Sequence, residues 1–368
     1  MAQFFYGTLR DPELLAIVLG RAVVPVSAHL PGHAVCHAGE AAFPLIVAGG
    51  GGVDGLLAEG LSADDLARLQ WYEGAFGYEL RAVTVKTADG ARAAQVWFPP
   101  QGQSPGAAWS LRHWQDHHAP LVRATAREVM AAFGRIPADR LPRMWHIMES
   151  RAQSRLTGAR AADSALSGMA RADVTVIATR RPYQNFFAVE EYDLTFRQFD
   201  GTTSPQIERG VFLSADAALV LPYDPRRDAV LVIEQFRSGP FARGDAHPWC
   251  LEPIAGLIDG GETPEAAARR ETLEEANLTV DRLIHIGRGY ASPGDSTGFY
   301  NMFCAPCDLP DAAAGVGGLA SESENIRSHI LPYARFLDLL DGGHLNVTPL
   351  IAMGHWLARH RDGLRAAY

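Results

Sequence analysis

The apolar and polar positions of the chain follow three different patterns. In residues 1–103, short apolar runs alternate with Gly and Pro, which is typical of strands joined by turns. In residues 104–171, apolar positions recur at helical spacing. In residues 172–368, strand-like runs dominate until two helical stretches close the pattern. We therefore predict an α/β (α+β) protein with a mixed first domain, a helical connector and linker, and a second domain of strands and helices.

The first stretch contains two helix signals among its strands. Asp11, followed by a proline, is a suitable N-cap for a helix over residues 11–20, and Ser62 begins a second helix over residues 62–74. Strand-like runs fill most of the remainder. Two of them flank Asp89-Gly90, a dipeptide that favours a tight hairpin turn, so these two are predicted to pair.

The middle stretch predicts helices that join the two domains. Its apolar residues at helical spacing are Val122, Val129, Met130, Phe133, Leu141, Met144, Trp145 and Met148. It holds ten Arg and five Asp or Glu residues. A surface that faces phosphate or RNA is one interpretation of this excess; we favour the other, salt bridges between domains and solvated helix faces. Small residues over 157–173 predict a linker.

The third stretch is organised around residues 255–278. Glycines near its start mark a loop that bends sharply. Thr263 is a good N-cap, and Pro264 suits the first helical position, where no N–H is needed. Good helix formers follow until Asn277, which can end the helix in the left-handed conformation. The sequence therefore predicts this helix together with both of its ends.

Three carboxylates crowd one side of that helix. Glu271 and Glu275 are one turn apart, and Glu274 is their neighbour. Like charges at this spacing repel one another, so the arrangement makes sense if a divalent cation collects them. Mg²⁺ and Mn²⁺ favour carboxylate oxygens and substrate phosphates. We therefore predict a metal site; a surface helix with an acidic face is the alternative.

This stretch resembles the Nudix box, G-x5-E-x7-R-E-U-x-E-E-x-G-U, in which U is a bulky aliphatic residue. The positions that match at the right spacing are Gly256, Glu262, Arg270, Glu271, Glu274, Glu275 and Leu278. Thr272 stands where the pattern has an aliphatic residue, which could weaken packing under the helix. Asn277 stands where the pattern has its last Gly, and Asn also visits the left-handed region.

The resemblance implies that residues 172–368 form an α/β/α sandwich. Nudix enzymes hydrolyse a nucleoside diphosphate linked to another group, and bound Mg²⁺, or Mn²⁺, neutralises the charge of the pyrophosphate. By position in the box, the expected metal ligands are Glu271, Glu275 and the backbone carbonyl of Ala255. Glu274 is the next candidate ligand and a candidate catalytic residue. Glu262 is expected to pair with Arg270 and fix the loop.

Beyond the box, residues 173–362 resemble the ADP-ribose pyrophosphatase branch of this superfamily. The pieces that carry the resemblance are VLVIEQFRSGP, PWCLEPIAGLIDGGE, YASPGDST and GLASESENIRSHI. It implies that Arg237 contacts the substrate, that Glu322 is the general base, and that Glu324 is a further metal ligand. It also implies a homodimer that hydrolyses ADP-ribose to AMP and ribose 5-phosphate.

The first stretch resembles the γ-glutamylcyclotransferase-like (AIG2-like) superfamily. The matching pieces are YGTLR at residues 6–10 and WYEG at residues 71–74, followed by Tyr78 and Arg81. The resemblance implies a small mixed β-barrel whose first loop presents backbone groups to a γ-glutamyl substrate. The loop residues concerned are Tyr6, Gly7, Thr8 and Leu9. Glu73 would shuttle a proton as 5-oxoproline forms, a role that a raised pKa in an aromatic pocket would suit.

Several functional alternatives stay open. The barrel could be a γ-glutamyl-amine cyclotransferase, or it could be inactive and serve packing or regulation. The second domain could hydrolyse another nucleoside diphosphate sugar, or bind ADP-ribose as a sensor without hydrolysis. The retained Glu271, Glu274 and Glu275 count against the sensor. The order of the two domains resembles bacterial proteins described as tellurite-resistance ADP-ribose pyrophosphatases, although four scattered cysteines suggest no tellurium chemistry.

Composition and charge exclude some partners. Hydrophobic residues make up 47% of the chain and charged residues 20%, as in an ordinary globular protein. A net charge of −9 argues against a general nucleic-acid or anionic-membrane binder. No run of 18 apolar residues and no leader-like start is present, and four cysteines are too few for a disulfide scaffold. We therefore expect a cytoplasmic protein with a small-molecule substrate.

Overall fold

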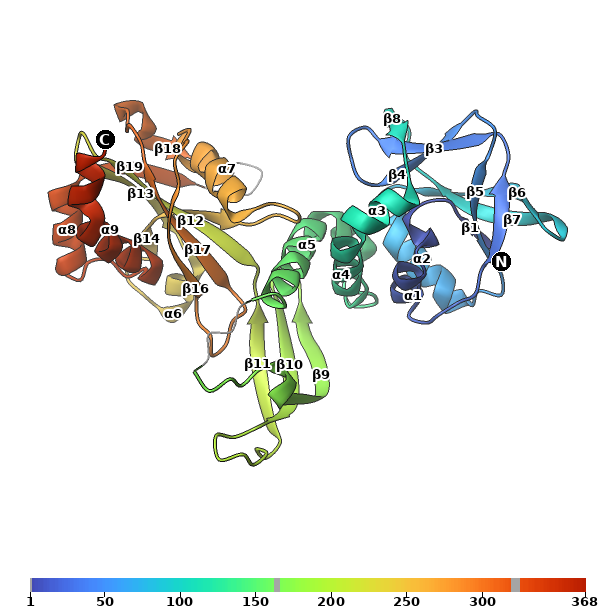
Figure 1. Ribbon diagram of the computed structural model, residues 1–368, viewed down its shortest axis with the longest axis horizontal. Coiled ribbons are helices and arrows are strands. Elements are labelled where there is room, and N and C mark those ends of the chain that lie inside the picture. Colours follow the sequence, from blue (N-terminus) through green and yellow to red (C-terminus); the bar gives the residue numbers. More distant parts are fainter. Residues whose placement is uncertain (1, 162–165, 319–324) are drawn as a thin grey trace. The chain divides into compact units, whose positions relative to one another are not determined.

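The computed structural model describes residues 2–161, 166–318 and 325–368 (Figure 1). The chain forms two compact units. The first consists of Met1–Val174 with Arg181–Ala188, and the second of Thr175–Arg180 with Val189–Tyr368. The first unit contains a barrel and a group of helices, and the second contains a large mixed sheet with helices on both faces.

Five strands of the first unit close a barrel. In barrel order they are β1 (Gln3–Phe5), β5 (Val53–Ala58), β2 (Val26–Leu30), β6 (Glu79–Thr87) and β7 (Gly90–Phe98). Thr87 pairs with Gly90, which confirms the predicted hairpin, and Gly90 has a φ of 112° that favours glycine. Buried apolar side chains such as Phe4, Leu57 and Val96 fill the interior. The mixed β-barrel implied by the family resemblance is confirmed.

A second sheet and five helices complete the first unit. The sheet has the order β4 (Pro44–Ala48), β3 (His33–Ala38), β8 (Pro105–Ala108). The helices are α1 (Pro12–Leu19), α2 (Ala63–Gly74), α3 (Leu111–His117), α4 (Ala119–Met130) and α5 (Leu141–Gly158), with 3₁₀ turns η1 (Thr8–Arg10), η2 (Ala138–Arg140) and η3 (Arg171–Asp173). The predicted caps are present, because the Asp11 and Ser62 side chains accept hydrogen bonds from backbone N–H groups of α1 and α2.

Arginines of the helical stretch form ion pairs within the first unit. Arg123 of α4 donates to the buried carboxylate of Asp11 at 2.9 and 2.6 Å. Glu128 of α4 is 2% exposed and lies 3.4 Å from the guanidinium of Arg151 on α5. These contacts hold α4 against the start of α1 and against α5. Both ion pairs lie within the first unit, so the expected salt bridges between domains stay a prediction.

The second unit is built on an eight-stranded sheet. Its main path is β16 (Ile284–Tyr290), β17 (Phe299–Pro306), β12 (Asp216–Asp224), β13 (Ala229–Phe236), β19 (Ile326–Pro332) and β18 (Gly315–Gly317), while β14 (Trp249–Glu252) pairs with β13 and β15 (Ile254–Leu257) pairs with β12. β12 runs parallel to β17 and is buried along its whole length. A strand buried on both faces lies at the centre of a layered domain.

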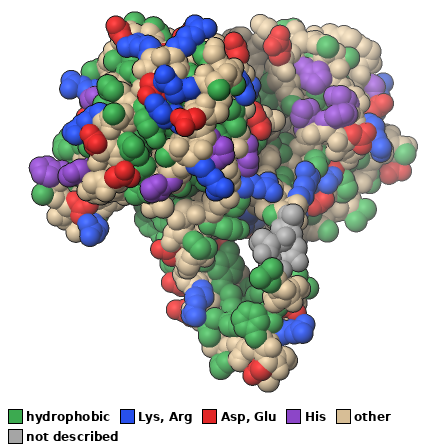
Figure 2. All heavy atoms as spheres, turned by 60° about the vertical axis from the view of Figure 1, so that its left-hand side comes forward, with side chains coloured by type: hydrophobic (Ala, Val, Ile, Leu, Met, Phe, Trp, Pro, Cys, Tyr) green, Lys and Arg blue, Asp and Glu red, His purple; other side chains and the backbone are tan. Residues whose placement is uncertain are grey.

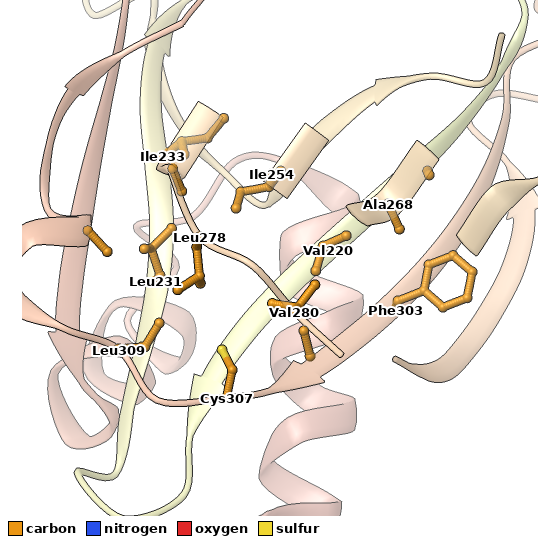
Figure 3. Packing of buried hydrophobic residues seen from close by; sticks show 14 of the residues in the cluster. Val220, Leu231, Ile233, Ile254, Ala268, Leu278, Val280, Phe303, Cys307 and Leu309 are labelled. Atoms are coloured by element: carbon orange, nitrogen blue, oxygen red, sulfur yellow. The ribbon is translucent and has the colours of Figure 1, made fainter. Parts of the chain in front are cut away.

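Alternate residues of β12 enter two separate cores. Val220 points into a cluster with Leu231, Ile254 and Phe303, which packs under helix α7 (Pro264–Ala276) (Figure 3). Leu219, Leu221 and Tyr223 point to the opposite face of the sheet, where they pack against α8 (Tyr333–Asp341) and α9 (Thr348–Ala366). The shorter elements are α6 (Ser238–Arg243) and the 3₁₀ turn η4 (Asp311–Ala313). The α/β/α sandwich implied by the Nudix resemblance is confirmed.

A separate three-stranded sheet has the order β11 (Ile207–Leu213), β10 (Ala188–Phe196), β9 (Val174–Gln184). Many of its apolar side chains are exposed, and Figure 2 shows hydrophobic side chains gathered in this lower part of the view. The exposed residues on these strands are Val174, Val176, Ile177, Tyr183, Phe196 and Phe212. Among the residues that the structure describes, no helix combines the length and apolar character needed to cross a membrane.

Candidate active sites

The box residues lie on α7, and both ends of this helix are as predicted. The Thr263 side chain accepts a hydrogen bond from the backbone N–H of Ala266 at 3.2 Å. Asn277 ends the helix with φ of 48° and ψ of 40°, in the left-handed region. Asn277 therefore supplies the conformation for which the box pattern has glycine.

Thr272, the other departure from the box pattern, is fully buried beneath α7. Its hydroxyl donates a hydrogen bond to the carbonyl of Ala268, one turn earlier, at 2.6 Å. A buried hydroxyl with an internal partner avoids the cost of an unsatisfied polar group. The helix therefore accommodates a threonine here, and the weaker packing expected from the sequence stays a prediction.

Three of the expected metal-binding residues lie together around Gly256. Glu275 is 3% exposed, and its carboxylate accepts a hydrogen bond from the backbone N–H of Ala255 at 3.2 Å. A Cβ placed on Gly256 would come within 1.8 Å of Glu271 Oε1, so the Glu271 carboxylate lies directly against the Gly256 backbone. The box glycine is required because a carboxylate fills the space that a side chain would need.

Arg270 compensates the charge of the box carboxylates. Its Nη1 donates to Glu271 at 2.6 Å and to Glu274 at 3.2 Å. Its Nε and Nη2 donate to the two oxygens of Glu262 at 3.1 and 2.9 Å. The hydrogen bonds that Arg270 donates to Glu262, with the charge of Glu271, raise the pKa of Arg270 further above its ordinary value. The predicted Glu262–Arg270 pair is confirmed, and one guanidinium contacts three carboxylates.

The donors around Gly256 fit a divalent cation by their chemistry. Carboxylate and backbone oxygens are the ligands that Mg²⁺ and Mn²⁺ prefer. Within residues 2–161, 166–318 and 325–368, no three Asp, Glu, His or Cys side chains are grouped closely enough to hold a metal ion by themselves. Glu322 and Glu324, the expected base and further ligand, lie outside the described residues.

Arg237, the expected substrate contact, follows β13 and is held by Glu252 of β14. Its Nε and Nη2 donate to the Glu252 carboxylate at 2.9 and 2.7 Å. Glu252 is buried, whereas the Arg237 side chain is 44% exposed. Burial raises the pKa of the nearby Tyr300 hydroxyl, the Glu252 charge raises it further, and Arg237 lowers it. Sequence reasoning missed Glu252, although a glutamate between apolar residues of a strand was a signal.

Three aromatic rings gather at the end of β13, next to Arg237 in the chain. The Phe236 ring lies 5.5 Å from the Trp249 ring and 5.9 Å from the Phe241 ring, measured between centroids. All three side chains are exposed. Because flat aromatic faces stack on other planar groups, these exposed rings offer a surface for a planar ligand.

A cavity of about 540 Å³ in the first unit gathers the residues of the cyclotransferase motifs. Tyr6, Gly7, Thr8 and Leu9 line it where β1 passes into η1, and Glu73 lines it from the last turn of α2. The two motifs are more than sixty positions apart in the chain. The barrel therefore brings together all five residues that the sequence singled out in this domain.

The surroundings of Glu73 suit proton transfer. Tyr6, Tyr72 and Tyr78 line the same cavity. Burial raises the pKa of Glu73 to about 7. Burial also raises the pKa of Tyr78 to about 12, with a further contribution from the Glu73 charge. A carboxyl whose pKa lies near 7 can both take and give a proton at neutral pH, as a proton shuttle must.

Four residues that line this cavity come from the helical stretch and were not assigned to it from the sequence: Trp114, Val122, Trp145 and Glu149. Trp145 and Glu149 extend from α5. The Trp145 ring lies 5.0 Å from the Phe76 ring and 6.1 Å from the Tyr72 ring, measured between centroids. Trp145 and Glu149 are about one helical turn apart, so they lie on one face of α5. Nothing in the sequence indicated that this face would meet the barrel cavity.

Comparisons with known proteins match both units. The family of γ-glutamyl cyclotransferase, AIG2-like, matches residues 3–116, and the NUDIX domain matches residues 213–313. ADP-ribose pyrophosphatase of Escherichia coli (strain K12) is 36% identical over 194 residues, which cover 52% of this chain and 91% of that protein. GDP-mannose pyrophosphatase of Yersinia pestis (strain Pestoides F) is 35% identical over 122 residues, which cover 33% of this chain and 61% of that protein.

A solved structure of an ADP compounds hydrolase matches with 24% identity and a TM-score of 0.40, and covers 51% of this chain and 96% of that one. Helix α7, which carries the box residues, lies inside the region that the NUDIX domain matches. The match to the E. coli relative covers 91% of that protein. The chain belongs to the Nudix family and is a Nudix pyrophosphohydrolase that also carries an AIG2-like γ-glutamyl cyclotransferase domain.

Proposed function

We propose that the second unit hydrolyses the pyrophosphate bond of ADP-ribose, with AMP and ribose 5-phosphate as products, in a Mg²⁺-dependent reaction. The observation that carries the proposal is the gathering of Ala255, Glu271 and Glu275 around a glycine that leaves room for a carboxylate. The substrate is chosen because the E. coli ADP-ribose pyrophosphatase is 36% identical across 91% of its length.

The roles of the box residues follow from their places. Glu271, Glu275 and the Ala255 carbonyl would hold the metal, and Mn²⁺ could replace Mg²⁺ at such oxygen donors. When bound, the cation stabilises the negative charge that develops on the phosphate oxygens. Glu274 accepts a hydrogen bond from Arg270, as Glu271 does, and would act in catalysis together with these ligands. Glu324 is proposed as a further ligand and Glu322 as the general base.

Substrate binding is assigned to the surface around Arg237. Its guanidinium is fixed by the buried Glu252 and remains half exposed, so it can bind phosphate without losing its position. The exposed rings of Phe236, Phe241 and Trp249 lie close to one another at the same end of β13 and would stack on the planar base of the nucleotide. A charged contact and a stacking surface together suit a nucleoside diphosphate sugar.

A substrate panel tests this proposal. Purified protein is incubated with ADP-ribose, ADP-glucose, GDP-mannose and NADH, with and without Mg²⁺, and the released products are separated and identified. Mg²⁺-dependent cleavage that strongly favours ADP-ribose supports the proposal. Preference for GDP-mannose or ADP-glucose would assign the enzyme to another nucleoside diphosphate sugar. Binding of ADP-ribose without cleavage of any substrate would instead support the sensor alternative.

A second activity is proposed for the first unit, the conversion of a γ-glutamyl amine into 5-oxoproline and the free amine. The observation that favours it is the placement of Glu73 in the same cavity as residues 6–9. The α-amine nitrogen attacks the γ-carbonyl carbon, the bond to the leaving amine breaks, and Glu73 carries the proton from the attacking nitrogen to the leaving one. Release of 5-oxoproline from γ-glutamyl amines tests this activity. Its absence would leave the domain as an inactive regulatory part.

We also propose a homodimer in the cytoplasm. The exposed apolar side chains of β9, β10 and β11 form a surface that a second copy could cover. All four cysteines are unpaired, as in a reducing compartment. Sedimentation analysis of the purified protein would give the mass of a dimer if this is right, and polar substitutions at Ile177 and Phe212 would shift it toward the monomer. A wild-type monomer at all concentrations contradicts the proposal.

A further inference from the structure

The barrel cavity contains a second carboxylate that the cyclotransferase motifs do not include. Glu149 lines the cavity together with Glu73, but it comes from α5, outside residues 3–116 that match the AIG2-like family. Residues 149 and 73 are far apart in the chain, and only the packing of α5 brings them to one cavity. The function of Glu149 is therefore not explained by the proton transfer assigned to Glu73.

The position of Glu149 is fixed by its helix. Trp145, one turn earlier on the same face, packs edge-on against Phe76 at 5.0 Å between centroids. The opposite face of α5 is anchored by fully or nearly fully buried side chains, among them Ile147 and Met148. Glu149 itself is partly buried. Its charge, like that of Glu73, contributes to a raised pKa of the Tyr72 hydroxyl, after the larger effect of burial, so both carboxylates lie near that hydroxyl.

The lining of the cavity favours a cation. It contains these two carboxylates, and among the described residues that line it there is no Lys, Arg or His. Aromatic side chains form most of the wall: Phe4, Phe5, Tyr6, Phe43, Tyr72, Phe76, Tyr78, Trp97, Trp114 and Trp145. An ammonium group gains from aromatic faces and from carboxylates when it is removed from water. The same wall stabilises an alkyl chain between two polar ends.

Buried polar atoms in the wall also point to a ligand. Trp97 is 6% exposed, and its indole N–H has no hydrogen-bond acceptor among the described residues. The side-chain carbonyl oxygen of Gln103 is likewise buried without a described donor. Both residues line the cavity. An unsatisfied buried donor and acceptor are costly, and a ligand with carbonyl or carboxylate oxygens and N–H groups would satisfy them.

We propose that Glu149 is a specificity residue, which binds an ammonium group at the far end of an alkyl chain whose other end lies near Glu73. The favoured ligand is thus a γ-glutamyl amide whose amine portion carries a second cationic nitrogen, as in a conjugate of a diamine. The γ-glutamyl half rests on the proposed cyclotransferase activity, whereas the ammonium site does not. Glu149 takes no part in bond making or breaking.

The test compares ligand pairs that differ by one charge. Full-length protein is titrated in a calorimeter with γ-glutamylputrescine and γ-glutamylbutylamide, and separately with putrescine and butylamine. Release of 5-oxoproline from the two conjugates is measured in parallel. We expect wild-type protein to bind the ligand with the additional terminal ammonium group more tightly than its butyl counterpart, by about tenfold or more in each pair. A charge-assisted hydrogen bond contributes at least that much.

Variants assign that preference to Glu149. Glu149→Gln is expected to reduce the ratio within each pair to near one, and Glu149→Asp to restore part of it. Asp139→Asn, which removes an exposed carboxylate of the same helical stretch outside the cavity, is the control and should keep the wild-type ratio. Thermal unfolding of each variant shows whether it is folded. If Glu149→Gln is unstable, the preference ratio is measured with Glu149→Asp instead.

The outcomes separate this inference from the cyclotransferase proposal. Binding of putrescine that depends on Glu149, without any 5-oxoproline from either conjugate, supports the ammonium site and refutes the cyclotransferase. Turnover of both conjugates at equal efficiency, unaffected by Glu149→Gln, supports the cyclotransferase and overturns the inference. Equal binding of the charged and uncharged partners in wild-type protein, or no binding of any of the four ligands, also overturns it.

Discussion

In the barrel cavity, Glu73 lies among aromatic side chains and no Lys, Arg or His is among the described residues that line the wall. In the box site, Glu271 and Glu274 share the guanidinium of Arg270. Burial without a counter-charge raises the pKa of Glu73 to about 7, which suits proton exchange. The box carboxylates face a positive partner, and carboxylate oxygens are ligands that Mg²⁺ prefers. The same type of side chain thus suits two different chemistries, because its surroundings differ.

The largest expected effect concerns the charge of a box ligand. Glu275→Gln keeps the size of the side chain but removes the charge of a proposed metal ligand that is 3% exposed. We expect kcat for ADP-ribose to fall on the order of 10³-fold, with the fold intact. Steady-state kinetics at saturating Mg²⁺ measures this. Glu265→Gln, an exposed carboxylate in the first turn of α7, is the matched control, and a Glu275→Gln enzyme at full rate would refute the metal assignment.

The same substitution in the other site should affect a different reaction. Glu73→Gln removes the proposed proton carrier, so 5-oxoproline formation should fall by about 10²- to 10³-fold. Hydrolysis of ADP-ribose by the same preparation should stay nearly unchanged if the two sites act separately. Both activities are assayed on one protein sample. A large loss of ADP-ribose hydrolysis would show that the two sites are coupled.

Gly256→Ala tests the space that the box carboxylate needs. The new Cβ would come within 1.9 Å of the Glu271 carboxylate carbon, so this side chain must move. Displacement of a catalytic group by about 1 Å costs on the order of 10²-fold in rate, which is the loss expected for ADP-ribose hydrolysis. Gly289→Ala is the control, because no atom lies within 4 Å of its added Cβ. Equal rates for both variants would contradict the close approach of Glu271.

Proton binding to Glu73 should appear in the stability of the first unit. The pKa of Glu73 is raised from 4.5 to about 7, so the folded protein holds this proton more tightly than the unfolded chain. Stability should therefore fall as pH rises from about 4.5 to about 7, by up to about 3 kcal/mol before solvent screening reduces it. Above pH 7 this group adds no further change.

Urea denaturation followed by tryptophan fluorescence measures this dependence, because five of the seven tryptophans belong to the first unit. Glu73→Gln should flatten the pH dependence in that window. Glu59→Gln, an exposed carboxyl of the same unit, should leave it as in the wild-type protein. An unchanged slope in the Glu73 variant would assign the titration to another group.

The sequence was most informative where the relevant contacts are local. The ends of α7, the Glu262–Arg270 pair and the carboxylates of the box lie within 23 residues, so spacing along one helix and loop was enough to predict them. The caps at Asp11 and Ser62 are local for the same reason. Glu149 and Trp145 could not be assigned to the barrel cavity, because their helix meets residues more than seventy positions away. Side-chain periodicity shows which face of a helix is apolar, but not what it contacts.

The contact of Glu252 with Arg237 was likewise not predicted from the sequence, and substitution of Glu252 has the smallest expected effect on ADP-ribose hydrolysis. It is buried and accepts three hydrogen bonds from Arg237, at 2.9, 3.1 and 2.7 Å, although Glu252 lies in β14 and Arg237 follows β13. Glu252→Gln keeps one acceptor but loses the charge, so Arg237 should become less well fixed. We expect KM for ADP-ribose to rise about tenfold while kcat changes less, because the guanidinium is proposed to bind the substrate and has no proposed role in proton transfer. Glu234→Gln, at a half-buried carboxylate of β13 paired with His329 at 2.9 Å, is the control. If Glu252→Gln lowered kcat alone, Glu252 would act on the box site and not through Arg237.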